Sequence, residues 1–412
     1  MNTHDPRLLL DTLRNHLTQP EANVTFLFGA GTSCAVRVPV IADDTGQATP
    51  KMRSLIPNVA ELTTVCVNEI RKLDLVDDLK KFGDAYDLIE KEIRPDNRDS
   101  NIEDILSCVR RKLSAVGVND KLSGLNKAEL SQLEKTIQST IAKLVNPERS
   151  LYPDKLPHEE FVRWIARMPR EQPVEIFTTN YDVLFETALE AERVPAFDGF
   201  VGCNRPFFCH ESLIRPESAP APGWTRLWKI HGSINWQLEK IAGRLRLIRT
   251  EPHNMGEMIL PSQHKYDESR KQPYSALLDR FTKTLERDDS ILIVCGYSFS
   301  DEHINAIIFD ALEAKPRPNV IAIQYDDPTE GSALANRAAR YLNLMVLGPT
   351  VSYLGGKRGT WKLGQLRNAK HIEEAFELDP LAEGEEQTGF GKLMLGDFAK
   401  FSAFLGALTG PK

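Results

Sequence analysis

Four short stretches of the chain combine residue types that could bind a nucleotide and activate water. They are "GAGTS" at 29–33, "TTNYD" at 178–182, "HGS" at 231–233 and "GYSFSD" at 296–301. Glycines let backbone amides approach a phosphate closely. An asparagine amide can bind a hydroxyl or a water, and a histidine with a pKa of about 6.5 can accept a proton. Together these types predict phosphate binding combined with general-base chemistry.

The glycine-rich stretch alone also fits an ordinary turn between a strand and a helix. The usual dinucleotide fingerprint requires a third glycine after Gly29 and Gly31, and Cys34 stands at that position. That fingerprint also requires an acidic residue at the end of a second strand, whereas Asp43 and Asp44 lie in a polar segment. An ordinary Rossmann dehydrogenase is therefore disfavoured.

The polar residues of the other three stretches have structural alternatives as well. Asn180 and Asp182 lie between a predicted strand and a predicted helix, where both residue types cap helices well. Ser300 or Asp301 could cap the helix that follows them. A single histidine at the end of a strand, such as His231, is most often structural. The chemistry therefore depends on whether the stretches meet in space.

Five apolar segments predict the strands that would bring these stretches together. The first segment covers 24–29, and the other four end near Thr178, at 231–232, at Gly296 and near Gln324. The helical patterns "DVLFETALEAE" and "DEHINAIIFDALEA" follow the second and fourth segments. The alternation predicts an α/β fold, with a Rossmann-like parallel sheet covered by helices on both faces. Ligands of such sheets bind beyond the carboxyl ends of the strands, where all four stretches fall.

The remaining segments predict an all-helical insertion and a C-terminal extension. We expect a first part of the core at 1–57, the insertion at 58–168, the remainder of the core at 169–349 and the extension at 350–412. Within the insertion, Ser100 and Glu103 form a capping-box pattern, and Asn126 precedes another helix that ends before Pro147. An apolar helix near 390–408 is expected to pack on its own core or to form an interface; its apolar set is Phe390, Leu393, Phe398, Phe401 and Leu405.

The amino-acid composition limits which kinds of binding partner are expected. The 412 residues include 51 basic and 58 acidic side chains, for a net charge of -7. This balance disfavours broad binding to nucleic acid, which requires a basic face, and we expect no direct sequence-specific contact with nucleic acid. The apolar runs are too short to span a bilayer and the first residues lack the apolar core of a signal peptide. We therefore expect a cytoplasmic protein without membrane contact.

The cysteines argue against a structural metal. Six are scattered along the chain and no two form a CxxC pair. The only suggestive group is Cys203, Cys209 and His210, and no second ligand pair accompanies it. Buried, reduced thiols are the expected state, and no metal is expected.

The order of the four stretches resembles that of the sirtuin family. Sirtuins carry a GAG-x-S loop, a T-x-N-x-D motif, a catalytic His-Gly and a Gly-x-Ser in this order. The resemblance covers the five predicted strands, about half of the chain. It implies that the substrate is NAD, whose pyrophosphate would lie against Gly29, Ala30, Gly31 and Ser33.

The same resemblance assigns roles to residues of the later stretches. Asn180 and Asp182 would line the nicotinamide and ribose pocket, and His231 would be the catalytic base. Gly296 and Ser298 would contact the dinucleotide, and Gln324 would approach its adenosine half.

The departures from the family are as informative as the matches. Sirtuins that deacylate proteins hold a zinc ion on two cysteine pairs after the His-Gly, and these pairs are missing here. Their Asp-Phe-Arg segment is absent, with only Arg37 and Pro39 nearby, and Thr179 replaces their glutamine. What remains resembles the sirtuin-like NAD hydrolases of bacterial anti-phage systems.

We therefore predict an enzyme that cleaves NAD to nicotinamide and ADP-ribose. A protein deacylase is one alternative, and a non-catalytic sensor of NAD or ADP-ribose is another. A compact chain of this kind resembles the subunits that pair with a HerA-like hexameric ATPase. A homo-oligomer that docks on such a ring is the expected assembly.

Overall fold

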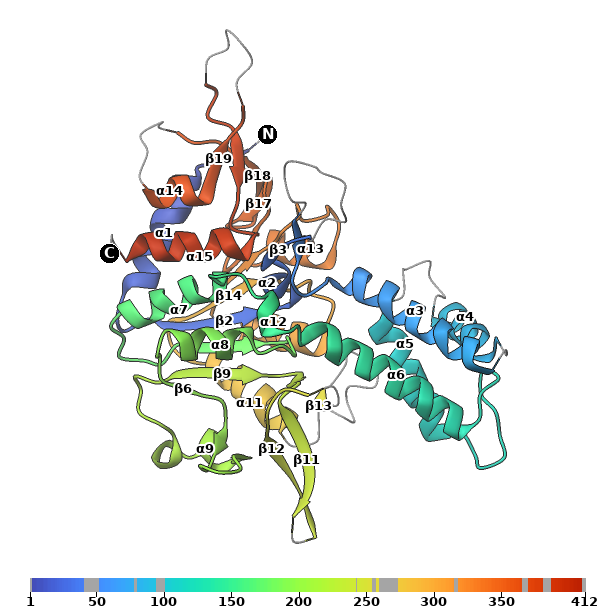
Figure 1. Cartoon of the computed structure of the whole chain (residues 1–412). Helices are drawn as coiled ribbons and strands as arrows, with labels where there is room; N and C mark the ends of the chain where they lie inside the picture. Colours follow the sequence, from blue (N-terminus) through green and yellow to red (C-terminus); the bar gives the residue numbers. More distant parts are fainter. Residues whose placement is uncertain are drawn as a thin grey trace.

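The computed structural model describes residues 2–40, 52–77, 80–93, 101–241, 243–253, 257–258, 273–314, 318–364, 370–380 and 387–409. Asp43 and Asp44 lie outside these ranges. The chain folds around a large, mostly parallel sheet with helices on both faces (Figure 1). The predicted α/β, Rossmann-like fold is therefore confirmed.

Ten strands of the described chain form the main sheet. Their order across the sheet is β1-β18-β17-β16-β15-β14-β2-β5-β9-β6. Their bounds are β1 (Thr3–His4), β2 (Asn23–Phe28), β5 (Glu175–Thr178), β6 (Ala196–Phe197), β9 (Thr225–Lys229), β14 (Ser290–Cys295), β15 (Asn319–Ile323), β16 (Leu344–Leu347), β17 (Val351–Leu354) and β18 (Lys357–Trp361).

The central strands have the connectivity of a doubly wound dinucleotide-binding fold. Numbered by their place in the chain, β2, β5, β9, β14, β15 and β16 lie in the order 3-2-1-4-5-6 and pair in parallel. The order reverses between β2 and β14. In such folds the ligand binds at this reversal, beyond the carboxyl ends of the strands.

Alternating side chains of the central strands build two separate cores. Phe26 and Phe28 of β2 belong to one cluster, and Leu27 between them belongs to the other. This is the period of two expected of a strand that is buried on both faces. The first face is covered by α1 (Pro6–Thr18), α7 (Pro157–Arg167), α8 (Leu184–Ala191), α14 (Lys370–Ala375) and α15 (Phe398–Leu408). The opposite face is covered by α11 (Tyr274–Leu285), α12 (Glu302–Glu313) and α13 (Ala333–Arg340).

A helical segment with a core of its own interrupts the sheet between β2 and β5. It contains α3 (Val59–Asp77), α4 (Lys81–Ile93), α5 (Ile102–Ala115) and α6 (Lys127–Val145). These helices extend to one side of the sheet (Figure 1). The capping box of α5 uses Asn101 and Asp104, one residue beyond the predicted pair, whereas Asn126 caps α6 as expected. Helix α7 also falls within 58–168, but it packs on α8 and α15 in the core of the sheet. The predicted domain boundaries stay a prediction.

The smaller elements lie in the loops and in the C-terminal part. The helix α2 (Ala30–Cys34) follows β2, and α9 (Glu211–Ile214) lies in the loop after β8. Short 3-10 turns cover Arg149–Leu151 and Pro216–Ser218. The minor strands are β3 (Arg37–Pro39), β4 (Met52–Ser54), β7 (Phe200–Val201), β8 (Phe207–Phe208), β10 (Gly232–Ser233), β11 (Trp236–Ile241), β12 (Arg244–Arg249), β13 (Glu257–Met258), β19 (Phe376–Leu378) and β20 (Gly391–Leu393).

The C-terminal part differs from the sequence-based expectation in two ways. First, β17 and β18 extend the main sheet in antiparallel pairing, in a segment where no strand was predicted. Second, the terminal helix begins at Phe398 rather than near 390, because Gly391–Leu393 forms a strand. Phe398, Phe401 and Leu405 are fully buried against the core of the same chain. The apolar face of this helix is therefore internal and offers no interface.

No helix in the described part of the chain combines the length and the apolar character needed to cross a membrane.

Candidate active site

The loops after β2 and β14 meet at the reversal of strand order through three glycines. The amide of Gly29 donates to the carbonyl of Cys295 at 3.2 Å, and the amide of Gly31 donates to the carbonyl of Gly296 at 2.9 Å. A methyl group on Gly31 would lie 2.7 Å from the Cα of Gly296, closer than side-chain atoms pack. Gly296 itself has a φ of +67°, a backbone conformation that favours glycine. Contact between the two loops thus requires these glycines, whatever ligand they also accommodate.

Asn180, in the loop after β5, fastens the loop after β2. Its Nδ2 donates to the carbonyl of Gly29 at 3.1 Å, to Oγ1 of Thr32 at 3.0 Å and to Oγ of Ser33 at 2.9 Å. The residue is buried, with 7% of its surface exposed. Because the amide nitrogen is directed at the loop, Oδ1 is the side-chain atom left to accept a hydrogen bond from a ribose hydroxyl or a water.

Asp182 joins the same network through Ser33. The hydroxyl of Ser33 donates to Oδ2 of Asp182 at 2.6 Å, and both residues are buried. The other carboxylate oxygen accepts from the backbone amide of Leu184 at 3.1 Å. The hydroxyl of Ser33 therefore faces Asn180 and Asp182, and Ser33 is linked to the site through hydrogen bonds to these two residues. Asp182 holds the loops together in this geometry.

A buried lysine, unnoticed in the sequence, supports the turn that carries Asn180 and Asp182. Lys229 ends β9, and its Nζ donates to the backbone carbonyls of Tyr181 and Asp182 and to Oε1 of Glu186 at 2.9 Å. Burial raises the pKa of Glu186, and the Lys229 ammonium opposes that shift. The sequence offered no signal for this role, because a lysine at the end of an apolar strand usually reaches solvent.

His231 faces a carboxylate from a distant loop. Its Nε2 lies 3.0 Å from Oδ2 of Asp301, and the two side chains are only 8% and 4% exposed. Since β9 is separated from β14 by β5 and β2, this contact crosses the carboxyl ends of two intervening strands. Together with the contacts of Gly31 and Asn180, it joins the loops after β2, β5, β9 and β14. Asp301 was expected only as a possible helix cap, and it serves in both capacities.

Two buried tyrosines lie close to this pair. The rings of Tyr181 and His231 are 6.4 Å apart between centroids. The Tyr297 hydroxyl donates to the backbone carbonyl of Asp301 at 3.2 Å and to Oδ1 of Asn305 at 3.1 Å. Burial, as the main cause, raises the pKa of both phenols above the ordinary value, so they stay neutral at physiological pH.

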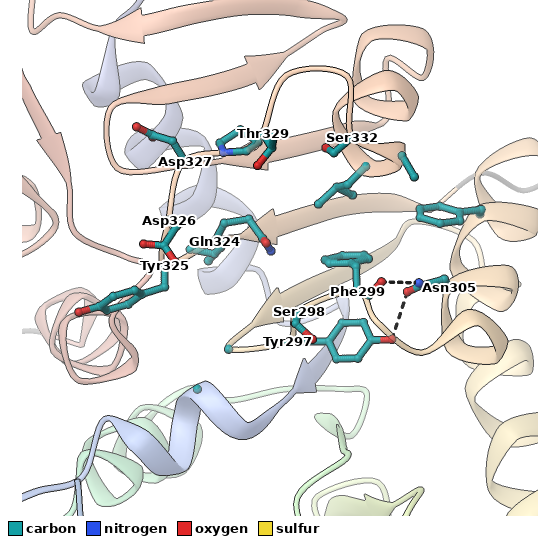
Figure 2. Close-up of a pocket in the computed structure, with 17 residues that line it drawn as sticks. Tyr297, Ser298, Phe299, Asn305, Gln324, Tyr325, Asp326, Asp327, Thr329 and Ser332 are labelled. Atoms are coloured by element: carbon teal, nitrogen blue, oxygen red, sulfur yellow. Dashed lines mark hydrogen bonds between the residues drawn. The ribbon is translucent and has the colours of Figure 1, made fainter. Parts of the chain in front are cut away.

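A pocket of about 480 Å³ opens beside the glycines, over the carboxyl ends of β14 and β15 (Figure 2). Four of the residues predicted to contact the dinucleotide line it: Gly31, Gly296, Ser298 and Gln324. Figure 2 shows the side chain of Gln324 extending between the loop after β14 and the loop that leads to α13. Its Nε2 is buried and makes no hydrogen bond to the described residues. A donor of this kind fits a ligand that brings an acceptor.

The other predicted residues lie outside the lining of this pocket. Ala30 is exposed at the start of α2, and Gly29 and Ser33 are buried in the loop contacts described above. The catalytic candidates Asn180, Asp182 and His231 lie in the loops after β5 and β9, on the other side of the strand reversal. The structure thus gathers the predicted residues along one edge of the sheet, in two groups.

The cysteines show no metal geometry. Cys203 is exposed, and Cys209 donates to Oε2 of Glu211 at 3.5 Å. Within the described ranges, no three histidine, cysteine or acidic side chains are placed to hold a metal ion.

Part of the chain matches a known protein family. Residues 174–347 match the family described as the SIR2-like domain. The match runs from the start of β5 to the end of β16 and therefore includes Asn180, His231 and Asp301. It supports a sirtuin-like family, whose members are enzymes that use NAD. No curated protein matches the sequence.

Proposed function

We propose that this protein is an NAD glycohydrolase, which cleaves NAD to nicotinamide and ADP-ribose. The bond that breaks joins the nicotinamide nitrogen to C1′ of its ribose, and its electron pair leaves with the ring. A cationic pyridinium thereby becomes a neutral base, so the leaving group needs no general acid. The enzyme has to hold the dinucleotide, stabilise a ribose cation and take a proton from water.

One observation carries the proposal: His231 lies against Asp301 at the same strand edge as the glycine loops. A histidine paired with a carboxylate is a common general base. Both residues follow strands that end on the two sides of the reversal, where dinucleotides bind in this fold. The pair is therefore placed to serve a ligand that spans the reversal.

The two groups of residues suggest how NAD would lie. The reacting ribose belongs beside His231 and Asn180, on the side of β5 and β9. The pyrophosphate would then cross the loops of Gly31 and Gly296. The adenosine half would enter the pocket with Gln324, whose buried Nε2 can donate to it. A pocket of about 480 Å³ is within the range of ordinary ligand sites.

The alternatives predict different products. A protein deacylase would consume NAD only with an acyl-lysine peptide, and the missing cysteine pairs speak against it. A sensor would bind NAD or ADP-ribose without cleaving either. A buried histidine–carboxylate pair at the site favours the hydrolase, since a sensor requires no base.

We further propose that the enzyme acts in anti-phage defence as a homo-oligomer on a HerA-like hexameric ATPase. Unchecked NAD hydrolysis would exhaust the host cell, so the activity requires a gate. The buried terminal helix leaves α3–α6 as the better docking element. These helices extend away from the sheet (Figure 1), and the segment exposes Leu88 at 50% and Val118 at 89%.

The decisive experiment incubates the purified protein with NAD, alone and with an ATPase encoded beside it. Products are identified by chromatography and mass spectrometry, and particle mass is measured by light scattering. Equal amounts of nicotinamide and ADP-ribose, formed without a peptide, are expected. Turnover only with an acyl-lysine peptide would establish the deacylase, and bound but intact NAD would establish the sensor. A monomer that works at full rate regardless of the ATPase would refute the proposed assembly.

A further inference from the structure

The contact between His231 and Asp301 also bears on which nitrogen of the imidazole does the chemistry. We propose that Asp301 is a positioning residue that holds His231 as the Nε2–H tautomer, so that Nδ1 is the proton acceptor. The catalytic consequence rests on the proposed NAD hydrolysis. The tautomer itself is independent of the substrate.

The assignment follows from the chemistry of the pair. An ionised carboxylate can only accept hydrogen bonds. The imidazole nitrogen 3.0 Å from Oδ2 of Asp301 must therefore carry a proton, and that nitrogen is Nε2. In a neutral imidazole the second nitrogen is then unprotonated. Both side chains are almost fully buried, which strengthens the interaction and prevents water from replacing it.

The position of Asp301 is fixed by the helix that it caps. Its Oδ1 accepts from the backbone amides of His303 at 3.0 Å and Ile304 at 3.4 Å, at the start of the 12-residue helix α12. The positive end of a helix dipole stabilises a negative charge there. One carboxylate oxygen thus belongs to the helix and the other to His231. Helix α12 thereby sets the direction in which the base points.

The proton balance of the proposed reaction is complete with this tautomer. A water oxygen forms the new bond to C1′ as the bond to nicotinamide breaks, and the water proton passes to Nδ1 of His231. The resulting imidazolium keeps its Nε2–H on Asp301, whose negative charge stabilises it. The proton then returns to solvent, and no oxidant or metal is required.

Two variants separate the tautomer from the helix cap. Asn and Ser cap helices about as well as Asp, so Asp301→Asn and Asp301→Ser should keep α12 in place. Neither offers a carboxylate to His231. Asp5→Asn is the matched control. The Oδ1 of Asp5 caps α1 by accepting from the backbone amide of Arg7 at 2.9 Å, and Asp5 lies at the far edge of the sheet.

The tautomer is read by nitrogen NMR of protein labelled with 15N-histidine, with His231 assigned from its loss in His231→Gln. In the wild type we expect a protonated Nε2 and an unprotonated Nδ1, a pattern that Asp5→Asn keeps and both Asp301 variants lose. The Asp301 variants should also cleave NAD about 10² to 10⁴ times more slowly, the range of general-base effects. A protonated Nδ1 in the folded wild type, or an unchanged tautomer in both Asp301 variants, would overturn the inference. A wild type inert toward NAD both alone and with the partner ATPase would refute the hydrolase and leave the NMR result standing.

Discussion

The amide of Gly31 donates a 2.9 Å hydrogen bond to the carbonyl of Gly296, which joins the loops of two strands 267 residues apart in the chain. Strands β2 and β14 are neighbours, and this bond lies at their carboxyl ends. The bond places the stretch at 29–33 against the stretch at 296–301. The predicted phosphate site and the pocket beyond it depend on this contact.

A methyl group at Gly31 should break this arrangement. It would lie 2.7 Å from the Cα of Gly296, and backbone cannot move aside as a flexible side chain can. We expect Gly31→Ala to lower the free energy of unfolding by about 1–3 kcal/mol and to weaken NAD binding. Denaturant unfolding and calorimetric titration with NAD measure the two effects. Gly223→Ala, with no atom within 4 Å of the added carbon, is the control and should change neither.

Removing the amide of Asn180 should cost stability as well as activity. Asn180→Ala leaves the carbonyl of Gly29 and the hydroxyls of Thr32 and Ser33 without this donor in a buried site. The expected loss in the free energy of unfolding is about 1–3 kcal/mol. The control, Asn336→Ala, removes a hydrogen bond from an exposed site and should have a smaller effect. If Asn180→Ala were as stable as the wild type, the fastening role assigned to its amide would be wrong.

His231→Ala should abolish NAD cleavage and leave the fold intact. The base contributes about 10² to 10⁴ to the rate of general-base reactions. Initial rates of nicotinamide release measure the loss, and circular dichroism verifies the fold. His4→Ala removes a histidine at the far edge of the sheet and should retain full activity. An active His231→Ala protein would eliminate this residue as the base.

The buried His158 should make the protein sensitive to mild acid. Burial lowers its pKa from 6.5 to about 3, and the ring packs between Phe185 and Phe398. Between pH 6.5 and pH 3, His158 is protonated in the unfolded chain but stays neutral in the folded state. Stability from this residue is therefore complete above pH 6.5 and falls by about 1.4 kcal/mol per pH unit toward pH 3.

His158→Phe removes the titration and should flatten this part of the curve. Denaturant unfolding at pH 7, 6 and 5 compares the slopes of the two proteins. Both ring nitrogens of His158 lack hydrogen bonds to the described residues, so the substitution sacrifices none of these. Parallel slopes for the wild type and His158→Phe would show that other groups cause the acid sensitivity.

The protein should fold and act without zinc. Elemental analysis of purified protein is expected to give far less than one zinc per chain, and chelators should change neither the unfolding curve nor NAD cleavage. Stoichiometric zinc that is lost together with folding would mean that Cys203, Cys209 and His210 had been misinterpreted.

The sequence alone determined the central fold, because local signals there agree with the tertiary structure. Apolar segments bounded by glycine and polar turns predicted β2, β5, β9, β14 and β15, with the end of β9 placed about two residues late. The caps at Asn126 and Asp301 were readable, since a side chain and an amide nearby in sequence form them. The glycines and His231 stood out because their types and order are unusual in a random turn.

Only the tertiary structure decided which partners these residues have. Asp301 pairs with His231 across 70 positions, and Asn180 fastens a loop 147–151 positions away, so neither contact leaves a periodic trace in the sequence. The buried Lys229 was missed for the same reason, because its partners Tyr181, Asp182 and Glu186 are distant in the chain. The terminal helix shows the limit most plainly. Its apolar spacing was visible in the sequence. Whether that face packs on its own sheet or on another molecule depended on where the fold placed Phe398 and Phe401. Periodicity shows that a face is buried, but it does not identify the surface that covers it.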